Sequence, residues 1–129
     1  MTSIHFQREV SGTVEAIVEK VTKALAAEGF GVLTRIDFDK KMKEKLNKDM
    51  RPLVILGACN PSLAYEAFLK NSDVTNLVPC NAVVREIRDG VVSVELVKPT
   101  ALMKMLGDDQ LVTLSEDADR RLEKVIQEL

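Results

Sequence analysis

Both cysteines of the chain lie in two short and similar strings, and these are the residues best suited to chemistry. The strings are Gly57-Ala58-Cys59-Asn60-Pro61 and Val78-Pro79-Cys80-Asn81-Ala82. Each string places a thiol beside a carboxamide. A thiolate can act as a nucleophile or a redox group, whereas an asparagine side chain can either bind a polar ligand or shape a turn. The repeated pair therefore marks a candidate site.

We expect the two strings to form one polar cleft that binds a small anionic or polar molecule. The candidate thiols for catalysis are Cys59 and Cys80. Cys59 precedes an expected helix start at Pro61, where the partial positive charge of the helix would lower the pKa of the thiol and attract an anion. The expected ligand-binding residues are Arg51, Gly57, Cys59, Asn60, Cys80 and Asn81.

The cleft requires that the strands carrying the two strings run antiparallel, because a parallel arrangement would place the thiols at opposite ends of the sheet. The sequence leaves both arrangements open. It also leaves open a structural role for the same residues. In that case Cys59 and Cys80 are small buried apolar residues, and Gly57 accommodates a β-bulge.

Other kinds of site have too few suitable residues. His5 is the single histidine of the chain, so the two cysteines cannot complete a four-ligand zinc site without carboxylates or a second subunit. His5 also has no recognisable partners for nucleophilic catalysis. The Gly29-Phe30-Gly31 segment precedes a strand instead of opening a helix, unlike a phosphate-binding loop. We therefore expect no metal and no resident cofactor.

The elements that must position the two strings follow from hydrophobic periodicity. We expect an α+β fold in the order βαβαβαββαα, with a single layer of about five mixed strands covered by helices. An Asp89-Gly90 hairpin turn joins the last two strands. The expected strands lie near residues 3–10, 30–38, 53–56, 81–88 and 92–96. The expected helices begin at Ser11 or Thr13, at Asp37 or Asp39, at Asn60, at Pro99 and at Ser115.

Three apolar segments predict how these elements pack. The continuous run Leu53–Leu56 is typical of a strand in the middle of a sheet that is covered on both faces. The lysine-rich helix near residues 40–48 is expected to turn Met42 and Leu46 inward. The last helix carries an apolar stripe that reaches Leu129, and this stripe can pack on its own sheet or on a second subunit.

Length and composition limit the class of protein. The 129 residues have a mass of 14.3 kDa, and 46% of them are hydrophobic and 29% charged. A chain of this size buries about two-thirds of its surface on folding. We therefore expect residues 1–129 to form a single domain whose core needs no disulfide. The composition excludes a disordered chain and a collagen-like fibre.

Charge and the terminal sequence restrict the partners. The formal net charge is −2, and acidic residues interleave with the lysines of residues 40–48, so nucleic acid is not an expected partner. No apolar stretch is long enough to cross a membrane, and the N-terminus lacks the basic and apolar regions of a signal peptide. We expect a cytoplasmic protein with free thiols and no membrane partner.

Four segments of the chain resemble a known family. They are Phe30-Gly31-Val32-Leu33-Thr34, Arg51-Pro52, Ile55-Leu56-Gly57-Ala58-Cys59-Asn60-Pro61 and Leu77-Val78-Pro79-Cys80-Asn81. Together they are similar to the prokaryotic domain-of-unknown-function family 302, and the likeness covers nearly the whole chain. The resemblance implies a compact α+β domain that pairs into dimers. It implies no particular reaction.

The leading hypothesis for function is a homodimeric module that binds a small molecule in the cleft lined by cysteine and asparagine. One alternative is a thiol-based redox or sulfur-handling enzyme, which would require a lowered pKa at Cys59. The other alternative is a structural or interaction domain in which the Cys-Asn strings only shape turns. The sequence leaves open whether the protein is an enzyme.

Overall fold

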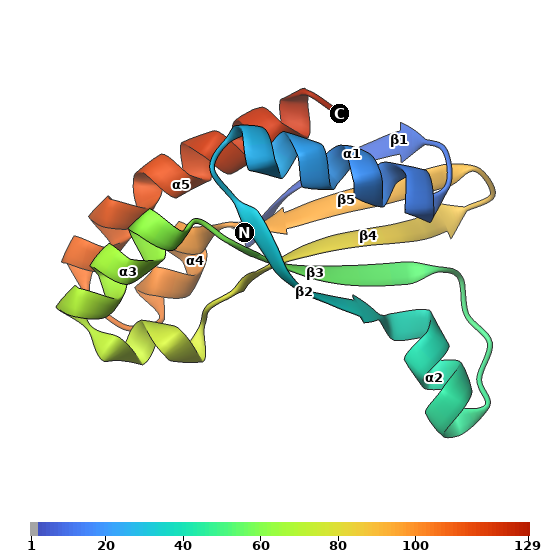
Figure 1. Cartoon of the computed structure of the whole chain (residues 1–129), viewed down its shortest axis with the longest axis horizontal. Coiled ribbons are helices and arrows are strands. Elements are labelled where there is room, and N and C mark those ends of the chain that lie inside the picture. The colour runs from blue at the N-terminus through green and yellow to red at the C-terminus, as the bar shows by residue number, and fades with distance from the viewer. Residues whose placement is uncertain (1–2) are drawn as a thin grey trace.

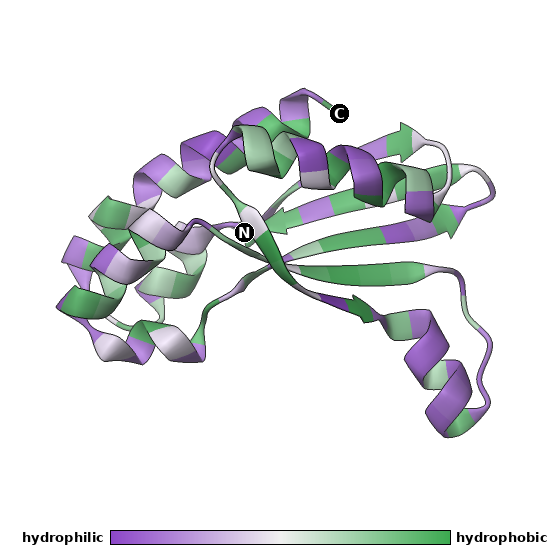
Figure 2. Cartoon of the chain, in the orientation of Figure 1, coloured by the Kyte–Doolittle hydropathy of each residue, from purple (hydrophilic) through white to green (hydrophobic). Residues whose placement is uncertain are grey.

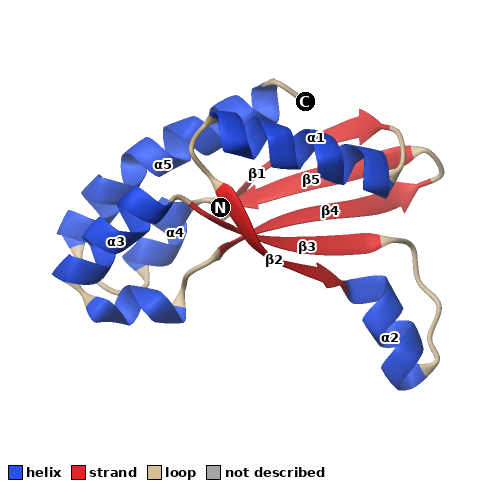
Figure 3. Cartoon of the chain, in the orientation of Figure 1, coloured by secondary structure: helices blue, strands red, loops and turns tan. Residues whose placement is uncertain are grey.

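The computed structural model of the chain describes residues 3–129 and confirms the predicted order of elements (Figures 1 and 3). The strands are β1 (His5–Ser11), β2 (Gly31–Asp37), β3 (Leu53–Cys59), β4 (Cys80–Arg88) and β5 (Val91–Val97). The helices are α1 (Val14–Ala27), α2 (Phe38–Leu46), α3 (Pro61–Lys70), the 3-10 helix η1 (Ser72–Asn76), α4 (Pro99–Lys104) and α5 (Asp109–Gln127). Among the described residues, no helix is long and apolar enough to cross a membrane.

The five strands form one sheet in the order β1-β5-β4-β3-β2. All four neighbouring pairs are antiparallel, so the strand directions are more uniform than the mixed arrangement expected from the sequence. Strand β4 lies at the centre, and β1 and β2 are the edges. The predicted hairpin turn connects β4 to β5, and Gly90 adopts the positive φ that such a turn requires.

Helices α1 and α5 cover one face of the sheet and form the main core with it (Figure 1). Alternate strand residues point into this core, because successive side chains of a strand face opposite sides. Burying one aliphatic side chain contributes roughly 1.5–3 kcal/mol. The apolar stripe of α5 takes part in this core, so it packs on the sheet of its own chain. The fully buried side chains include Val21, Leu25, Val84, Val94 and Val125.

The opposite face of the sheet is covered by no helix of the described chain (Figure 1). Along β3, Val54 and Leu56 point into the core and are 3% and 1% exposed. Leu53 and Ile55 point away from it and remain half-buried. Strand β3 lies beside the edge strand β2, so the predicted central position with cover on both faces is wrong for the single chain. Figure 2 shows that β3 is nevertheless hydrophobic along most of its length.

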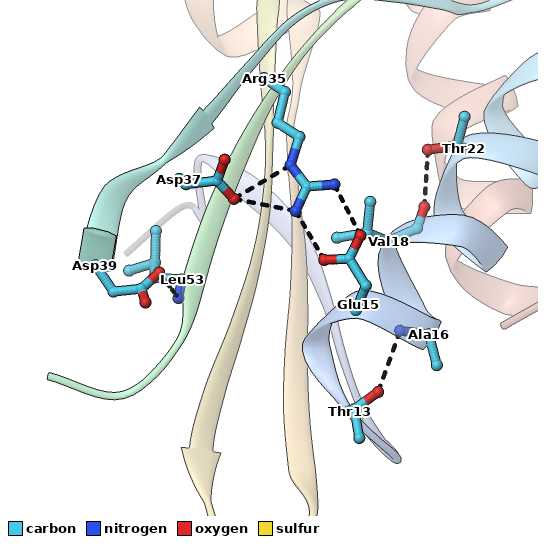
Figure 4. A network of polar contacts seen from close by, with 9 residues as sticks. All are labelled: Thr13, Glu15, Ala16, Val18, Thr22, Arg35, Asp37, Asp39 and Leu53. Carbon is cyan, nitrogen blue, oxygen red and sulfur yellow. Dashed lines mark hydrogen bonds and ion pairs between the residues drawn. The ribbon is translucent and has the colours of Figure 1, made fainter. Parts of the chain in front are cut away.

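An ion-pair network attaches the edge strand β2 to helix α1 (Figure 4). The Arg35 guanidinium donates to both carboxylate oxygens of Glu15, at 3.1 and 2.8 Å, and to Asp37 Oδ1 at 3.0 Å. These hydrogen bonds lower the pKa of Glu15 and raise the pKa of Arg35. Strand β2 buries little apolar surface. The bidentate contact between Arg35 and Glu15 therefore helps to fix the orientation of this strand relative to α1.

Helix α2 stands away from the rest of the molecule (Figure 1). Asp39 ties it to β3, because its Oδ1 accepts a hydrogen bond from the backbone N–H of Leu53 at 3.0 Å. All nine residues of α2 remain half-buried or exposed, and Leu46 is 62% exposed. Of the two residues predicted to pack inward, Met42 is half-buried, whereas the prediction is wrong for Leu46 in the single chain.

A small helical lobe closes the end of the sheet where β3 ends and β4 begins (Figure 3). The lobe consists of α3, η1, α4 and the first part of α5, packed around a second core of Val74, Met103 and Leu111. Asp119 joins α4 to α5, since its carboxylate accepts hydrogen bonds from the N–H and the hydroxyl of Thr100 at 3.1 and 2.6 Å. This lobe supplies one wall of the candidate site.

Helix α5 begins earlier than predicted. Ser115, the expected N-cap, lies inside the helix, where its Oγ donates to the carbonyl oxygen of Val112 at 2.9 Å. The N-cap is Asp108, whose Oδ1 accepts hydrogen bonds from the N–H groups of Gln110 (3.0 Å) and Leu111 (3.3 Å). Both residue types suit an N-cap, and the longer helix buries Leu111 in the lobe.

Substitution of the two candidate N-caps, Asp108 and Ser115, tests where α5 begins. We expect Asp108→Ala to lower the free energy of unfolding by about 1 kcal/mol, because two N–H groups of the first turn lose their acceptor. Ser115→Ala should stay within about 0.5 kcal/mol of the parent protein, since the better helix propensity of alanine offsets the lost hydroxyl bond. Urea unfolding of both variants measures the difference. A larger loss in Ser115→Ala would contradict the placement of the helix start.

Candidate functional site

The antiparallel pairing of β3 with β4 brings the two Cys-Asn strings to the same end of the sheet. Ala58 pairs with Cys80 and Gly57 pairs with Asn81. Cys59 and Cys80 therefore lie one position apart on neighbouring strands, and both are free thiols. Of the two arrangements that the sequence left open, the structure has the one that a joint site requires.

Cys59, Asn60 and Cys80 line a cavity of about 70 Å³ between this end of the sheet and the helical lobe. Ser115 also lines the cavity, and its Oγ donates to the carbonyl oxygen of Val112. Most of the remaining wall is apolar, and it includes Phe30, Leu63, Ala64, Ala67, Met103 and Leu111. No charged side chain occurs among the described residues that line the cavity. The space suits a small uncharged molecule, because a buried ion would have no counter-charge.

Asn60 combines a structural role with its place in the cavity wall. It is the N-cap of α3, and its Oδ1 accepts a hydrogen bond from the backbone N–H of Leu63 at 3.2 Å. Its Nδ2 lies beside Gly29, where an added Cβ would come within 3.1 Å of it. Gly29 has a positive φ and follows the end of α1. The side chain of Asn60 therefore already caps the N-terminus of α3.

Gly57 provides room for other side chains of the same chain. A Cβ at this position would collide with Thr34 Oγ1 and would lie 2.8 Å from Pro79 Cγ. The register of β2 against β3 shifts between Val32 and Thr34, so the extra residue lies in β2 opposite Gly57 and not at Gly57 itself, where the structural alternative placed a bulge. The space above Gly57 is therefore filled by β2 and by Pro79.

Arg51 and Asn81 lie outside the cavity. Arg51 precedes the other end of β3, and the strand from Leu53 to Cys59 alone spans about 20 Å at the usual rise per residue. There it forms ion pairs with Glu86 (2.7 Å) and Asp89 (2.9 Å). Asn81 is exposed, because it follows Cys80 in the strand and faces the opposite side of the sheet. Neither side chain can share a ligand with the two thiols in this chain.

The sequence did not mark Ser115, Met103 or the alanines of α3 as members of the site. Ala64 and Ala67 are three residues apart and lie on one side of α3, and this spacing of small residues was the available signal. His5 lies at the start of β1, and its Nδ1 is buried with no hydrogen-bond partner among the described residues. The described residues contain no cluster of three or more His, Cys, Asp or Glu side chains suited to a metal ion.

Comparison with known proteins adds the family. The model of a domain of unknown function, DUF302, matches residues 6–129. The chain belongs to the DUF302 family. It also matches the crystal structure of an uncharacterized conserved DUF302 protein from Bacillus stearothermophilus, with 31% sequence identity, a TM-score of 0.90 and 98% of each chain covered. No curated protein matches the chain. The family resemblance of the motifs is thereby confirmed.

In this DUF302 domain, the surroundings keep both thiols neutral. Burial raises the pKa of Cys59, and it raises the pKa of Cys80 to about 11, with added contributions from the charges of Cys59 and Asp119. The predicted lowering at Cys59 is wrong, because apolar surroundings disfavour a thiolate more than the start of α3 favours it. With this pKa, roughly one Cys80 side chain in ten thousand is ionised at pH 7.

The raised pKa values predict slow and strongly alkaline-dependent alkylation. Cys59→Ser and Cys80→Ser each leave one thiol, whose reaction with iodoacetamide can be followed by mass spectrometry as a function of pH. We expect both thiols to react more slowly than glutathione near neutral pH. The Cys80 rate should keep rising until about pH 11, since only the thiolate attacks. A thiol that reacts faster than glutathione at neutral pH would contradict this.

The close approach at Gly57 predicts a specific loss of stability. Gly57→Ala should lower the free energy of unfolding by about 1–3 kcal/mol, because the Thr34 hydroxyl can rotate away but the Pro79 ring must shift. Gly31→Ala is the matched control, since Gly31 lies on the neighbouring strand and an added Cβ there meets nothing within 4 Å. Urea unfolding should show at most a small change for the control. Equal losses in both variants would contradict the account.

Proposed function

We propose that this protein is a binding module for a small, uncharged and largely apolar molecule, held in the cavity between the end of the sheet and the helical lobe. The observation that carries the proposal is the cavity of about 70 Å³ that both strings border. Concave spaces with a mostly apolar wall are typical of small-molecule sites, and a bound molecule would cover the apolar side chains that border this one.

The composition of the wall supports an uncharged ligand in place of the anion expected from the sequence. Its polar residues are Asn60, Ser115, Cys59 and Cys80, whose side chains can form hydrogen bonds without carrying charge. An anion would need a cation beside it, and Arg51 is at the far end of the sheet, paired with two carboxylates. A few polar groups in an apolar wall are typical of small-molecule sites.

The state of the thiols favours binding over thiol chemistry. A redox or sulfur-handling enzyme would use a thiolate, and the raised pKa values at Cys59 and Cys80 keep both groups protonated near neutral pH. A neutral thiol still suits a binding site, because it packs as a small apolar group with a weak hydrogen-bond donor. In the proposed site, the cysteines shape the wall.

A matched pair of probes tests the proposal. 1-Butanol and butyrate have the same number of carbon atoms, and only butyrate is charged at neutral pH. We expect 1-butanol to cause saturable NMR shifts at the amides of Ala67, Cys80 and Ser115, and butyrate to cause none there, because a carboxylate would be buried without a partner. Ala67→Leu should abolish the shifts by filling the cavity, whereas Ala26→Leu, on the exposed side of α1, should leave them unchanged.

Three results would count against the proposal. Stronger binding of butyrate would favour the anionic ligand expected from the sequence. Shifts that persist in Ala67→Leu would place the binding elsewhere. The absence of saturable shifts at these amides would favour the structural alternative, in which the cavity is a packing defect.

A further inference from the structure

Two hydrogen-bond donors from distant parts of the chain converge at Gly29, in the turn between α1 and β2. We infer that they bind the carboxylate group of a small molecule, at a site outside the proposed ligand cavity. The donors are the side-chain amide of Asn60, at the start of α3, and the guanidinium of Arg121, on α5. We call the space bordered by these three residues the donor corner. Asn60 also lines the cavity, whereas Gly29 and Arg121 do not.

The space beside Gly29 is bordered by two nitrogen atoms. A Cβ built on Gly29 would lie 3.1 Å from Asn60 Nδ2 and 3.2 Å from Arg121 Nη1. Apart from Gly29 and its chain neighbours, no other heavy atom of the described residues lies within 4 Å of that position. Both distances are typical of N–H···O hydrogen bonds. A ligand with two oxygen atoms can therefore accept hydrogen bonds from both groups at once.

The Asn60 amide is largely buried, and its N–H groups lack a partner. The residue is only 9% exposed, and its Oδ1 accepts a hydrogen bond from the backbone N–H of Leu63 at 3.2 Å. That bond fixes the orientation of the amide, so the oxygen faces α3 and Nδ2 faces Gly29. Nδ2 donates to no acceptor among the described residues. A donor shielded from water is costly to leave unpaired, so this position favours a ligand that accepts.

Arg121 supplies the positive charge of the donor corner. Its Nη1 donates to the carbonyl oxygen of Glu28 at 3.2 Å, and its Nε lies 2.9 Å from Asp117 Oδ2. These two contacts hold the guanidinium over the turn. A guanidinium has five N–H groups, and the others, on Nη1 and Nη2, have no acceptor among the described residues. They suit a carboxylate, because arginine commonly binds this group through two parallel N–H bonds.

The surrounding charges favour a singly charged anion. Besides Arg121, the cations are Arg120 and Lys124, and the carboxylates paired with them are Asp117 and Glu28. Three cations against two carboxylates leave one net positive charge, which one bound carboxylate balances. A second negative charge, as on phosphate, would be repelled by Asp117 and Glu28 and would meet no further cation.

The turn at Gly29 has a structural explanation of its own. The N–H groups of Gly29 and Phe30 donate to the carbonyl oxygens of Ala26 (3.1 Å) and Leu25 (2.9 Å), an arrangement that commonly ends a helix at a glycine with positive φ. These bonds also satisfy carbonyl groups at the end of α1 that would otherwise disfavour an anion. The free donors beside the turn, and not the glycine, therefore indicate the site.

NMR titration with acetate at neutral pH tests the inference, and acetamide is the matched neutral probe. We expect acetate to cause saturable shifts of the Asn60 side-chain NH₂ signals and of the Gly29 amide. Acetamide should cause none, because hydrogen bonds from a guanidinium to a neutral carbonyl are weaker. The absence of saturable shifts with acetate, or equal shifts with acetamide, would overturn the inference. Tighter binding of inorganic phosphate would overturn the choice of a carboxylate.

Three substitutions separate the donor corner from a general attraction of anions to α5. Arg121→Gln should raise the Kd for acetate at least about tenfold, because a charge-assisted hydrogen bond is lost. Asn60→Asp should abolish saturable binding, since it keeps an acceptor for the cap of α3 but places a carboxylate of the chain beside Arg121. Arg120→Gln is the matched control and should change the Kd by less than about twofold, because the Arg120 side chain is 69% exposed and does not border Gly29.

Circular dichroism verifies that each variant is folded. A loss of acetate binding in Arg120→Gln equal to that in Arg121→Gln would overturn the inference, and so would binding that survives Asn60→Asp. The two proposed sites are distinguishable in the parent protein, because acetate should move the signals of the donor corner and 1-butanol those of the cavity wall. Acetate shifts without 1-butanol shifts would support the donor corner and contradict the proposed function alone.

Discussion

The register of β3 against β4 is the constraint on which both the core and the cavity depend. Pairing Ala58 with Cys80 aligns the buried residues of the two strands beneath α1 and α5. A shift of one residue would turn every side chain of β3 to the other face and would bury the wrong set. The same pairing brings both cysteines to one end of the sheet. Gly57 makes the local geometry possible, because Thr34 and Pro79 occupy the space of a side chain there.

The cavity and the neutral state of the thiols have a common physical cause. Small side chains meet where the lobe joins the sheet, among them Ala58, Ala64, Ala67 and the two cysteines, and they leave unfilled volume. The same apolar contacts remove water from the sulfur atoms, which raises the thiol pKa values. A site made in this way is better suited to holding a neutral molecule than to generating a nucleophile.

The distribution of apolar surface distinguishes the two sides of the sheet. Helices α1 and α5 cover one side with a continuous core. The other side combines half-buried aliphatic residues with ion pairs that are balanced within the chain, such as Arg85 with Glu95. Helix α2 adds an apolar stripe that its own chain does not bury. The chain therefore carries more apolar surface on this side than its described helices cover, while the arginines of β4 on this side are paired with carboxylates of the same chain.

The sequence by itself determined the elements that depend on local patterns. The period of α1, the Asn60-Pro61 helix start and the Asp89-Gly90 turn are each encoded within a few residues, so the order βαβαβαββαα could be predicted. Three of the six residues expected at the site from the repeated Cys-Asn strings, Cys59, Asn60 and Cys80, line the cavity. The sequence could not show whether the two strings lie together. No local pattern encodes whether the strands that carry them run parallel or antiparallel.

Only the tertiary structure decided the features that depend on contacts between distant segments. The strand register separated Arg51 and Asn81 from the thiols, and the apolar lobe reversed the expected direction of the Cys59 pKa shift. Asp108 and Ser115 are both competent N-caps, and the tertiary structure uses Asp108, which extends α5 so that Leu111 is buried. The spacing of apolar residues along a chain encodes the period of a helix or strand. The solvation of a side chain and its distance from residues of another strand are set only when the strands pair.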